Sequence, residues 1–211
     1  MRRIILFALL TVFSGSLMAQ AEKLLSESER REVMQSLTRA ALEVKTLQCG
    51  FVQTKTSDLL ADKAVSKGKM AFRSPNRLRW EYTEPHANLL VVNGDSVWMG
   101  GERFTREGSS ADRIRKAVSG MVSGMVSGLK LFDENAYEIS FYDAGTSWKA
   151  DMLPKSRSMK RMFTRLTLYF DKQTHVVSEI VLTEAGGDQT SIRFREMVRN
   201  AALADQLFEI H

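Results

Sequence analysis

The sequence holds a single cysteine, Cys49, among its 211 residues. One thiol cannot form an internal disulfide bond, and an exported domain of this size does not need one. A nucleophilic cysteine would need a base and an orienting group, and the residues near Cys49 in the sequence supply neither. We therefore expect Cys49 to be a small, buried apolar residue rather than a catalytic one.

Histidine is also scarce, and the motifs of common enzymes are missing. The histidines stand far apart in the chain, at His86, His175 and His211. This spacing argues against the closely spaced ligands of a typical zinc site. Neither G-x-S-x-G nor a Walker phosphate loop occurs. The sequence thus indicates a protein that is not an enzyme and that carries no metal or cofactor.

An excess of one charge is lacking as well. The formal net charge is +5, and it falls by two, to +3, if Arg2 and Arg3 leave with an N-terminal leader. Acidic and basic residues are mixed along the whole chain, whereas nucleic-acid-binding proteins usually gather basic residues on one face or stripe. We expect no nucleic-acid partner.

Long apolar runs are absent after the first residues. Residues 1–21, MRRIILFALLTVFSGSLMAQA, combine two arginines, an apolar run of about ten residues and small residues at the end, as in a secretory signal peptide. The run is shorter than the ~20 residues that span a bilayer, so an uncleaved anchor is the weaker alternative. We predict export, cleavage after Ala19 or Ala21, and one mature domain over residues 22–211. Because no cysteine stands at the cut, we expect no lipid on the new N-terminus.

A helix is predicted over residues 26–48. Ser26 and Glu29 have the spacing of a capping box. Apolar residues then recur at helical spacing, at Val33, Leu37, Ala40, Val44 and Leu47. One apolar stripe must therefore pack on another element.

From Phe51 the apolar period changes to two, which is typical of strands. Asn93-Gly94 is the strongest hairpin signal, because both central residues of a type I′ turn need positive φ. The pattern predicts one domain of roughly ten or eleven short antiparallel strands. These are 51–56, 66–72, 77–83, 89–92, 96–99, 137–142, 148–153, 163–170, 176–183 and 190–197, with a last apolar segment at 207–210.

Residues 110–130 interrupt the strands with apolar residues at helical spacing. Gly120, Gly124 and Gly128 recur every fourth residue there. Each glycine inside a helix costs about 1 kcal/mol relative to alanine. Two interpretations stay open, a low-complexity repeat and a weak helix that is meant to move.

Residues 77–82 alternate strictly between charged and apolar side chains. Leu78, Trp80 and Tyr82 share one face of the predicted strand, and the charged residues Arg77, Arg79 and Glu81 share the other. The chain also holds 11 methionines, which suit surfaces that accept changing apolar shapes. The apolar face is either a plain core or a surface kept for an apolar guest.

An ordered set of short motifs extends over essentially the whole mature chain. In the first half these motifs are Phe51-x-Gln53, Gly68-x-Met70-x-Phe72, Pro75, Leu78-Arg79-Trp80-Glu81-Tyr82, Pro85, Leu90-Val91-Val92-Asn93-Gly94 and Val97-Trp98. In the second half they are Leu153-Pro154-Lys155, Phe163-Thr164-x-Leu166-Thr167-Leu168, Phe170-Asp171, Glu179-Ile180, Asn200 and Phe208. In order and spacing this set resembles the LolA family of periplasmic carriers of outer-membrane lipoproteins.

The resemblance implies a mainly β (α+β) fold, an incomplete and strongly curved antiparallel barrel of about eleven strands with helices as a lid. It implies a monomeric periplasmic carrier that receives acylated lipoproteins from an inner-membrane ABC transporter and delivers them to the outer membrane, where an acceptor is expected. No nucleotide or other cofactor is implied. Combined with the alternation along the strands, it assigns to the ligand cavity Phe51, Met70, Phe72, Leu78, Trp80, Tyr82, Leu90, Val92 and Trp98.

The same resemblance makes residues 112–129 the lid, with Ile114, Val118, Met121 and Met125 as its apolar residues. In the family an arginine before the strand's proline holds the lid shut, whereas here that position is Ser74 and Arg73 precedes it. Arg73 is thus the latch candidate, although adjacent strand residues face opposite sides. A carrier or sensor of free lipid or glycolipid on the same fold stays open, while a lipid hydrolase lacks a nucleophile motif.

Overall fold

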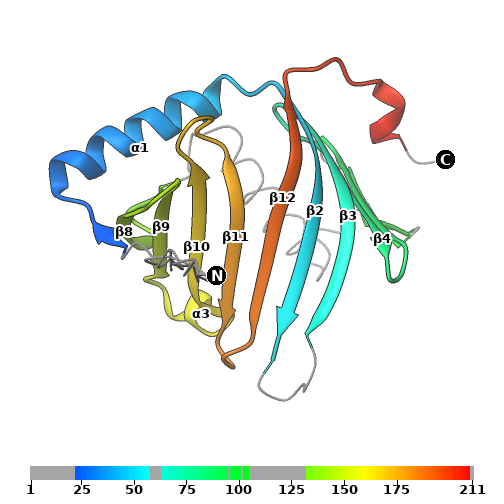
Figure 1. Cartoon of the computed structure of the whole chain (residues 1–211). Helices are drawn as coiled ribbons and strands as arrows, with labels where there is room; N and C mark the ends of the chain where they lie inside the picture. The colour runs from blue at the N-terminus through cyan, green and yellow to red at the C-terminus, as the bar shows by residue number, and fades with distance from the viewer. Residues whose placement is uncertain (1–21, 58–62, 95, 101, 105–131, 210–211) are drawn as a thin grey trace, which may run out of the picture.

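The computed structural model describes residues 22–57, 63–94, 96–100, 102–104 and 132–209. In these residues twelve strands form one sheet, in the order β1-β8-β9-β10-β11-β12-β2-β3-β4-β5-β6-β7 (Figure 1). The strands are β1 (Lys23–Leu24), β2 (Thr46–Thr56), β3 (Ala64–Arg73), β4 (Arg77–Glu84), β5 (Asn88–Asn93), β6 (Ser96–Met99), β7 (Glu102–Phe104), β8 (Tyr137–Ala144), β9 (Ser147–Pro154), β10 (Phe163–Asp171), β11 (Val177–Glu184) and β12 (Gln189–Arg199). The helical elements are α1 (Glu27–Leu42), α3 (Arg157–Lys160) and the 3-10 helix η1 (Asp205–Phe208).

All neighbouring strands pair antiparallel, which confirms the predicted mainly β fold. Most neighbours in the sheet are consecutive in the sequence, and the long-range pairs are β1 with β8 and, in the middle of the sheet, β12 with β2. In Figure 1 the blue-green strands of the first half and the yellow-orange strands of the second half meet at that pair. No helix in the described residues is long and apolar enough to cross a membrane.

Helix α1 begins as the sequence predicts. The Ser26 side chain accepts from the Glu29 amide, and the Glu29 carboxylate accepts from the Ser26 amide, so the capping box is confirmed. The helix ends at Leu42, however, and not at residue 48. The Asn200 side chain accepts from the Lys45 amide at 2.7 Å and donates to the Glu43 carbonyl at 3.1 Å, and these bonds replace the next helical turn.

Other local predictions need correction. The hairpin between β5 and β6 forms, but Asn93 pairs with Ser96, so Gly94 (φ 61°) opens the turn and Asn93 ends the strand. The last apolar segment is not a strand, because residues 205–208 form η1. The predicted helix at 110–130 lies outside the described residues, as do residues 1–21 of the predicted signal peptide.

The sheet has an inner face, which carries Leu78 and Trp80, and an outer face, which carries Arg77 and Arg79. Residues directly opposite each other in antiparallel strands share a face. One inner row therefore runs through Ala150, Leu168, Ile180 and Ile192 in adjacent strands. Inner-face side chains form two clusters, one on β8–β11 and one on β2–β6, with Ile192 and Phe194 of β12 packed against both.

Candidate functional site

An aromatic group forms the centre of the β2–β6 cluster. The Phe51 ring lies 4.3 Å from the Trp80 ring and 5.2 Å from the Tyr82 ring, between centroids. Phe194 of β12 meets Trp80 edge to face at 6.2 Å. Such tilted and edge-to-face contacts are the favoured geometries of aromatic pairs. The rings form one continuous apolar surface across strands β12, β2 and β4.

Gly68 of β3 makes this arrangement possible. The register places it directly between Phe51 and Tyr82 on the inner face. A Cβ at this position would lie 2.4 Å from Cζ of Phe51 and 2.1 Å from the Glu81 carbonyl oxygen. The missing side chain leaves room for the Phe51 ring to lie across β3.

Eight of the nine predicted cavity residues share this face and this cluster. Six are buried, and Tyr82 and Leu90 are partly buried against them. The buried six are Phe51, Met70, Phe72, Leu78, Trp80 and Val92. The structure thus brings together residues from β2, β3, β4 and β5 that only their alternation had linked.

Trp98 is the exception. It pairs with Val91, which pairs with Arg79, so the register places Trp98 on the outer face. Its neighbour Val97 pairs with Val92 and is buried in the cluster at 1% exposure. The resemblance and the alternation along the strands assigned Trp98 to the cavity, but the register of the β5–β6 hairpin decides which face each residue takes. We therefore replace Trp98 by Val97 in the candidate site.

Cys49 belongs to the same cluster and is 6% exposed. Burial raises the pKa of its thiol from an ordinary value of 9.0 to about 12. A thiol with so high a pKa is neutral near pH 7 and is a poor nucleophile. The expected buried, apolar role of Cys49 is confirmed.

A polar pair borders the aromatic group. The Tyr82 hydroxyl donates a hydrogen bond to Oε1 of Gln53 at 2.8 Å. Burial raises the pKa of Tyr82, so its hydroxyl stays protonated and available as a donor. The candidate site therefore combines an apolar surface with hydrogen-bonding groups at one edge.

The β8–β11 cluster is built differently. Val33 and Leu37 of α1 are packed among Phe141, Leu168 and Phe170. These side chains are almost fully buried, with Leu37 at 1% exposure. Helix α1 occupies this half of the inner face as an ordinary core element.

Arg73, the latch candidate, lies on the outer face opposite Arg77. Its guanidinium donates to the Asp205 carboxylate and the Leu203 carbonyl, and it lies over the Phe208 ring at 5.3 Å. These partners belong to the C-terminal segment, residues 200–209. Because Arg73 faces away from the inner cluster and holds this segment, it is no longer proposed as a lid latch. The lid residues Ile114, Val118, Met121 and Met125 lie outside the described residues.

The C-terminal segment is fixed by further outer-face groups. Arg77 donates to the Asp205 carboxylate at 2.8 Å, and Asn93 donates to the Phe208 carbonyl at 3.3 Å. Hydrogen bonding from Arg73 lowers the pKa of Asp205, which favours the charged carboxylate. Phe208 is fully buried. The sequence did not predict these contacts between the outer face and the C-terminal segment, because they join residues about 130 positions apart.

Nothing in the described residues resembles a metal centre, since they contain no group of three His, Cys, Asp or Glu side chains that could hold an ion. The family model described as "Outer membrane lipoprotein carrier protein LolA" matches residues 42–211.

The chain belongs to the LolA family. Its relatives include an outer-membrane lipoprotein carrier protein of Methylibium petroleiphilum, which is 28% identical over 179 residues, 84% of each chain. One from Chromobacterium violaceum is 28% identical over 78% of this chain and 76% of its own. Among solved structures, a LolA superfamily protein of Nitrosomonas europaea aligns over 84% of this chain and 97% of its own, with 11% identity and a TM-score of 0.45. The LolA family is a family of carriers and not of enzymes.

Proposed function

We propose that this protein is a periplasmic carrier that binds the acyl chains of lipoproteins on the inner face of β2–β6. The observation that carries the proposal is the continuous aromatic and aliphatic surface of that cluster in a chain of the LolA family. In this proposal an inner-membrane ABC transporter supplies the lipoprotein and the outer membrane receives it, with an acceptor there. The carrier acts as a monomer, after its signal peptide is removed at Ala19 or Ala21.

The chemistry of the face suits such a cargo. Acyl chains have no fixed shape, and the flexible thioether of Met70 beside the rings of Phe72 and Trp80 can adapt to them. Gln53 and Tyr82 lie where hydrogen-bonding groups can meet the polar end of a lipid. Their present bond to each other would exchange for bonds to the cargo.

Release of the cargo requires a free-energy cost in the bound state that offsets part of this binding. Burial of one chain of ~15 methylenes, at about 0.8 kcal/mol each, contributes on the order of 12 kcal/mol. Several chains in a rigid pocket would never leave. In the proposal, residues 112–129 close over the cluster as a lid, and Gly120, Gly124 and Gly128 weaken it. Replacing all three glycines by alanine is then expected to slow the transfer of cargo to outer-membrane vesicles.

The direct test is complex formation. The mature protein is incubated with inner-membrane vesicles that contain a triacylated lipoprotein and the releasing transporter, and the soluble fraction is resolved by gel filtration. We expect an equimolar soluble complex of protein and lipoprotein. Formation of this complex is expected to displace an apolar fluorescent probe that was bound to the free protein. No complex, together with free lipid or glycolipid extracted from the purified protein, would reject the lipoprotein carrier and favour a small-lipid carrier or sensor.

A matched pair of variants locates the binding face. Leu89 and Leu90 are adjacent and half-buried, but Leu90 packs on the inner cluster while Leu89 lies opposite Glu81 on the outer face. Leu90→Lys is expected to abolish binding of the apolar fluorescent probe to the protein. Leu89→Lys is expected to leave probe binding unchanged. Equal loss in both variants, with both folded by circular dichroism, would remove the inner face as the binding site.

A further inference from the structure

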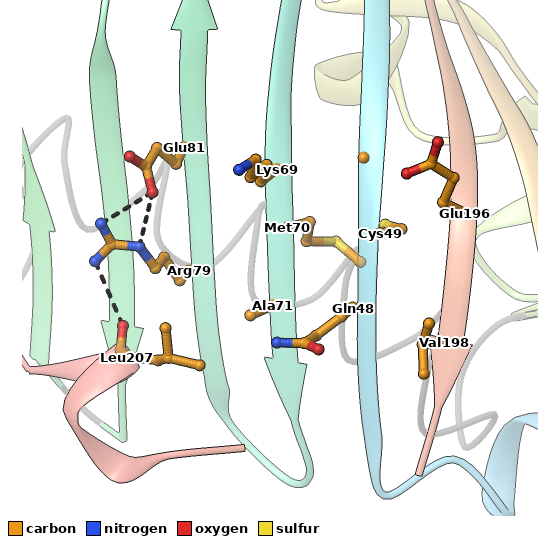
Figure 2. A pocket seen from close by; sticks show the side chains of 11 residues that line it. Gln48, Cys49, Lys69, Met70, Ala71, Arg79, Glu81, Glu196, Val198 and Leu207 are labelled. Atoms are coloured by element: carbon orange, nitrogen blue, oxygen red, sulfur yellow. Dashed lines mark hydrogen bonds and ion pairs between the residues drawn. The ribbon is translucent and has the colours of Figure 1, made fainter. Parts of the chain in front are cut away.

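The outer face contains a depression over strand β2. Its floor is formed by Gly50, which has no side chain, and by Ala71, which has only a methyl group. Figure 2 shows Val198 and Leu207 at its border, from β12 and from the C-terminal segment. Its volume is about 380 Å³. Val198 is 50% exposed, so its apolar side chain is accessible at this border.

Two cationic side chains flank this floor. The register places Gly50 directly between Lys69 of β3 and Arg195 of β12. Since neighbouring strands lie about 4.8 Å apart, the two Cα atoms are roughly 10 Å apart on one face. Nearby cations have partners, as in the pairs Lys67–Glu84 and Arg79–Glu81. Within the described part of the chain, Lys69 and Arg195 form no ion pair.

The outer face is hollowed a second time, one step further along β12 and β2. A second hollow of about 430 Å³ lies over β11, β12 and β2, and its lining includes Val52, Arg193 and Arg195. Arg193 is bound to Glu179 at 2.9 Å, whereas Arg195 forms no ion pair in the described residues and lies directly opposite Gly50 of the first hollow. We call the two hollows together the outer trough, defined by Gly50, Val52, Lys69, Ala71, Arg193 and Arg195.

We propose that the outer trough is a docking site for an extended, acidic segment of a partner protein. One apolar side chain of that segment lies over Gly50 and Ala71, between Val198 and Leu207. Carboxylates on either side of it meet Lys69 and Arg195. An apolar anchor in a desolvated pocket with charges at the rim is the usual arrangement of a specific interface.

The shape of the trough favours a peptide over a membrane surface. Its floor is recessed below the flanking side chains, so a flat bilayer would not reach Gly50 or Ala71. The carboxylates of Glu81 and Glu196 also line the first hollow, and they would repel a surface of uniform negative charge. A peptide can place its acidic residues away from them, because its charges are discrete.

The outer trough and the proposed acyl site lie on opposite faces of one sheet. Docking in the trough therefore leaves the inner cluster free, and both could be occupied at once. The docking proposal does not rest on the identity of the cargo, since it uses only outer-face groups.

The test is selection from a phage-displayed library of random peptides on the immobilised mature protein. We expect enriched peptides to combine acidic residues with one bulky apolar residue. Gly50→Leu fills the floor, and the nearest atoms to a Cβ there are at 3.8 and 3.9 Å, so the backbone accepts the change. This variant and the pair Lys69→Gln with Arg195→Gln are each expected to weaken peptide binding by about tenfold or more.

Lys172→Gln is the charge-matched control, because Lys172 pairs with Asp143 on the β8–β10 side of the sheet and lines neither hollow. It is expected to leave peptide binding unchanged. No enrichment, or enriched peptides that bind Gly50→Leu as well as the unmodified protein, would overturn the proposal. Binding to phosphatidylglycerol vesicles that is lost in the Lys69 and Arg195 variants, without peptide binding, would assign the trough to a lipid surface instead and reject a peptide partner.

Discussion

The two halves of the inner face show how one sheet can hold two kinds of apolar surface. On β8–β11 the cluster includes Val33 and Leu37 of α1, so this half is closed by a regular helix. The β2–β6 cluster includes no residue of α1, and it carries the aromatic group and the polar pair of Gln53 and Tyr82. Both halves are buried, and we propose only the second as the surface for an apolar guest.

The largest expected effect separates core from guest surface. Phe141→Ala in the β8–β11 cluster and Trp80→Ala in the β2–β6 cluster should each lower the free energy of unfolding by about 3–5 kcal/mol, because each leaves a cavity. Only Trp80→Ala should also weaken binding of an apolar probe to the folded protein. Urea unfolding and probe titration measure the two quantities, and equal loss of probe binding in both variants would erase the distinction between the halves.

A smaller effect probes the space beneath Phe51. Gly68→Ala places a Cβ against the Phe51 ring and the Glu81 carbonyl, so we expect a loss of about 1–3 kcal/mol in the free energy of unfolding and a changed tryptophan fluorescence. Gly50→Ala is the control on the neighbouring strand, where a Cβ has only ordinary contacts. If Gly68→Ala were as stable as Gly50→Ala, the close approach of Phe51 would not matter.

Cys49 reports on whether the β2–β6 half stays dry. Burial raises the pKa of the Cys49 thiol from 9.0 in the unfolded chain to about 12 in the folded protein. The contribution of the buried neutral thiol to the free energy of unfolding is therefore full below pH 9.0, and it falls as the pH rises from 9.0 to about 12. The stability advantage of the unmodified protein over Cys49→Ala should shrink by about 1.4 kcal/mol per pH unit in that range. Urea unfolding of both proteins from pH 8 upward checks this, and a constant difference would mean that water reaches the thiol.

The smallest effect concerns the outer face. The hydrogen bond from Arg73 lowers the pKa of Asp205 in the folded protein. The contribution of the charged Asp205 to the free energy of unfolding is therefore full above the ordinary pKa of aspartate, about 3.9, and it is lost as the pH falls through the lowered pKa of the folded protein. Asp205→Asn should release the C-terminal segment already at neutral pH, with faster hydrogen exchange at the Leu207 amide. Asp188→Asn, which affects only the distant pair with Lys55, should not. Unchanged exchange in Asp205→Asn would show that Phe208 alone holds the segment.

Alternation along the strands predicted much of the inner face, because side chains on a pleated strand must alternate. Leu78, Trp80 and Tyr82 share the inner face, and Arg77, Arg79 and Glu81 the outer one, as expected. The capping box of α1 was equally readable, since Ser26 and Glu29 interact within one turn. Local physics therefore determined these features.

Two of the errors involve partners far away in the sequence, because Asn200 ends α1 early and the C-terminal segment binds Arg73. The error at Trp98 is local, because it comes from the register of the β5–β6 hairpin. The sequence alone did not predict the outer trough, because only the pairing of β2 with β3 and β12 places Gly50 between Lys69 and Arg195. Such contacts depend on which strands become neighbours, and single-sequence periodicity does not contain that information.

The pairing of β2 with β12 has a consequence for the order of events in the cell. Leu47 lies opposite Arg199 and Thr56 opposite Gln189, so the central pair of the sheet joins the beginning of the domain to its end. Non-local strand pairs of this kind form slowly, because a long loop must close first. A chain that is synthesised from its N-terminus cannot complete its sheet until β12 has followed. During that interval the apolar strands β2 to β6 are without their neighbour, so the incomplete sheet is itself exposed to aggregation.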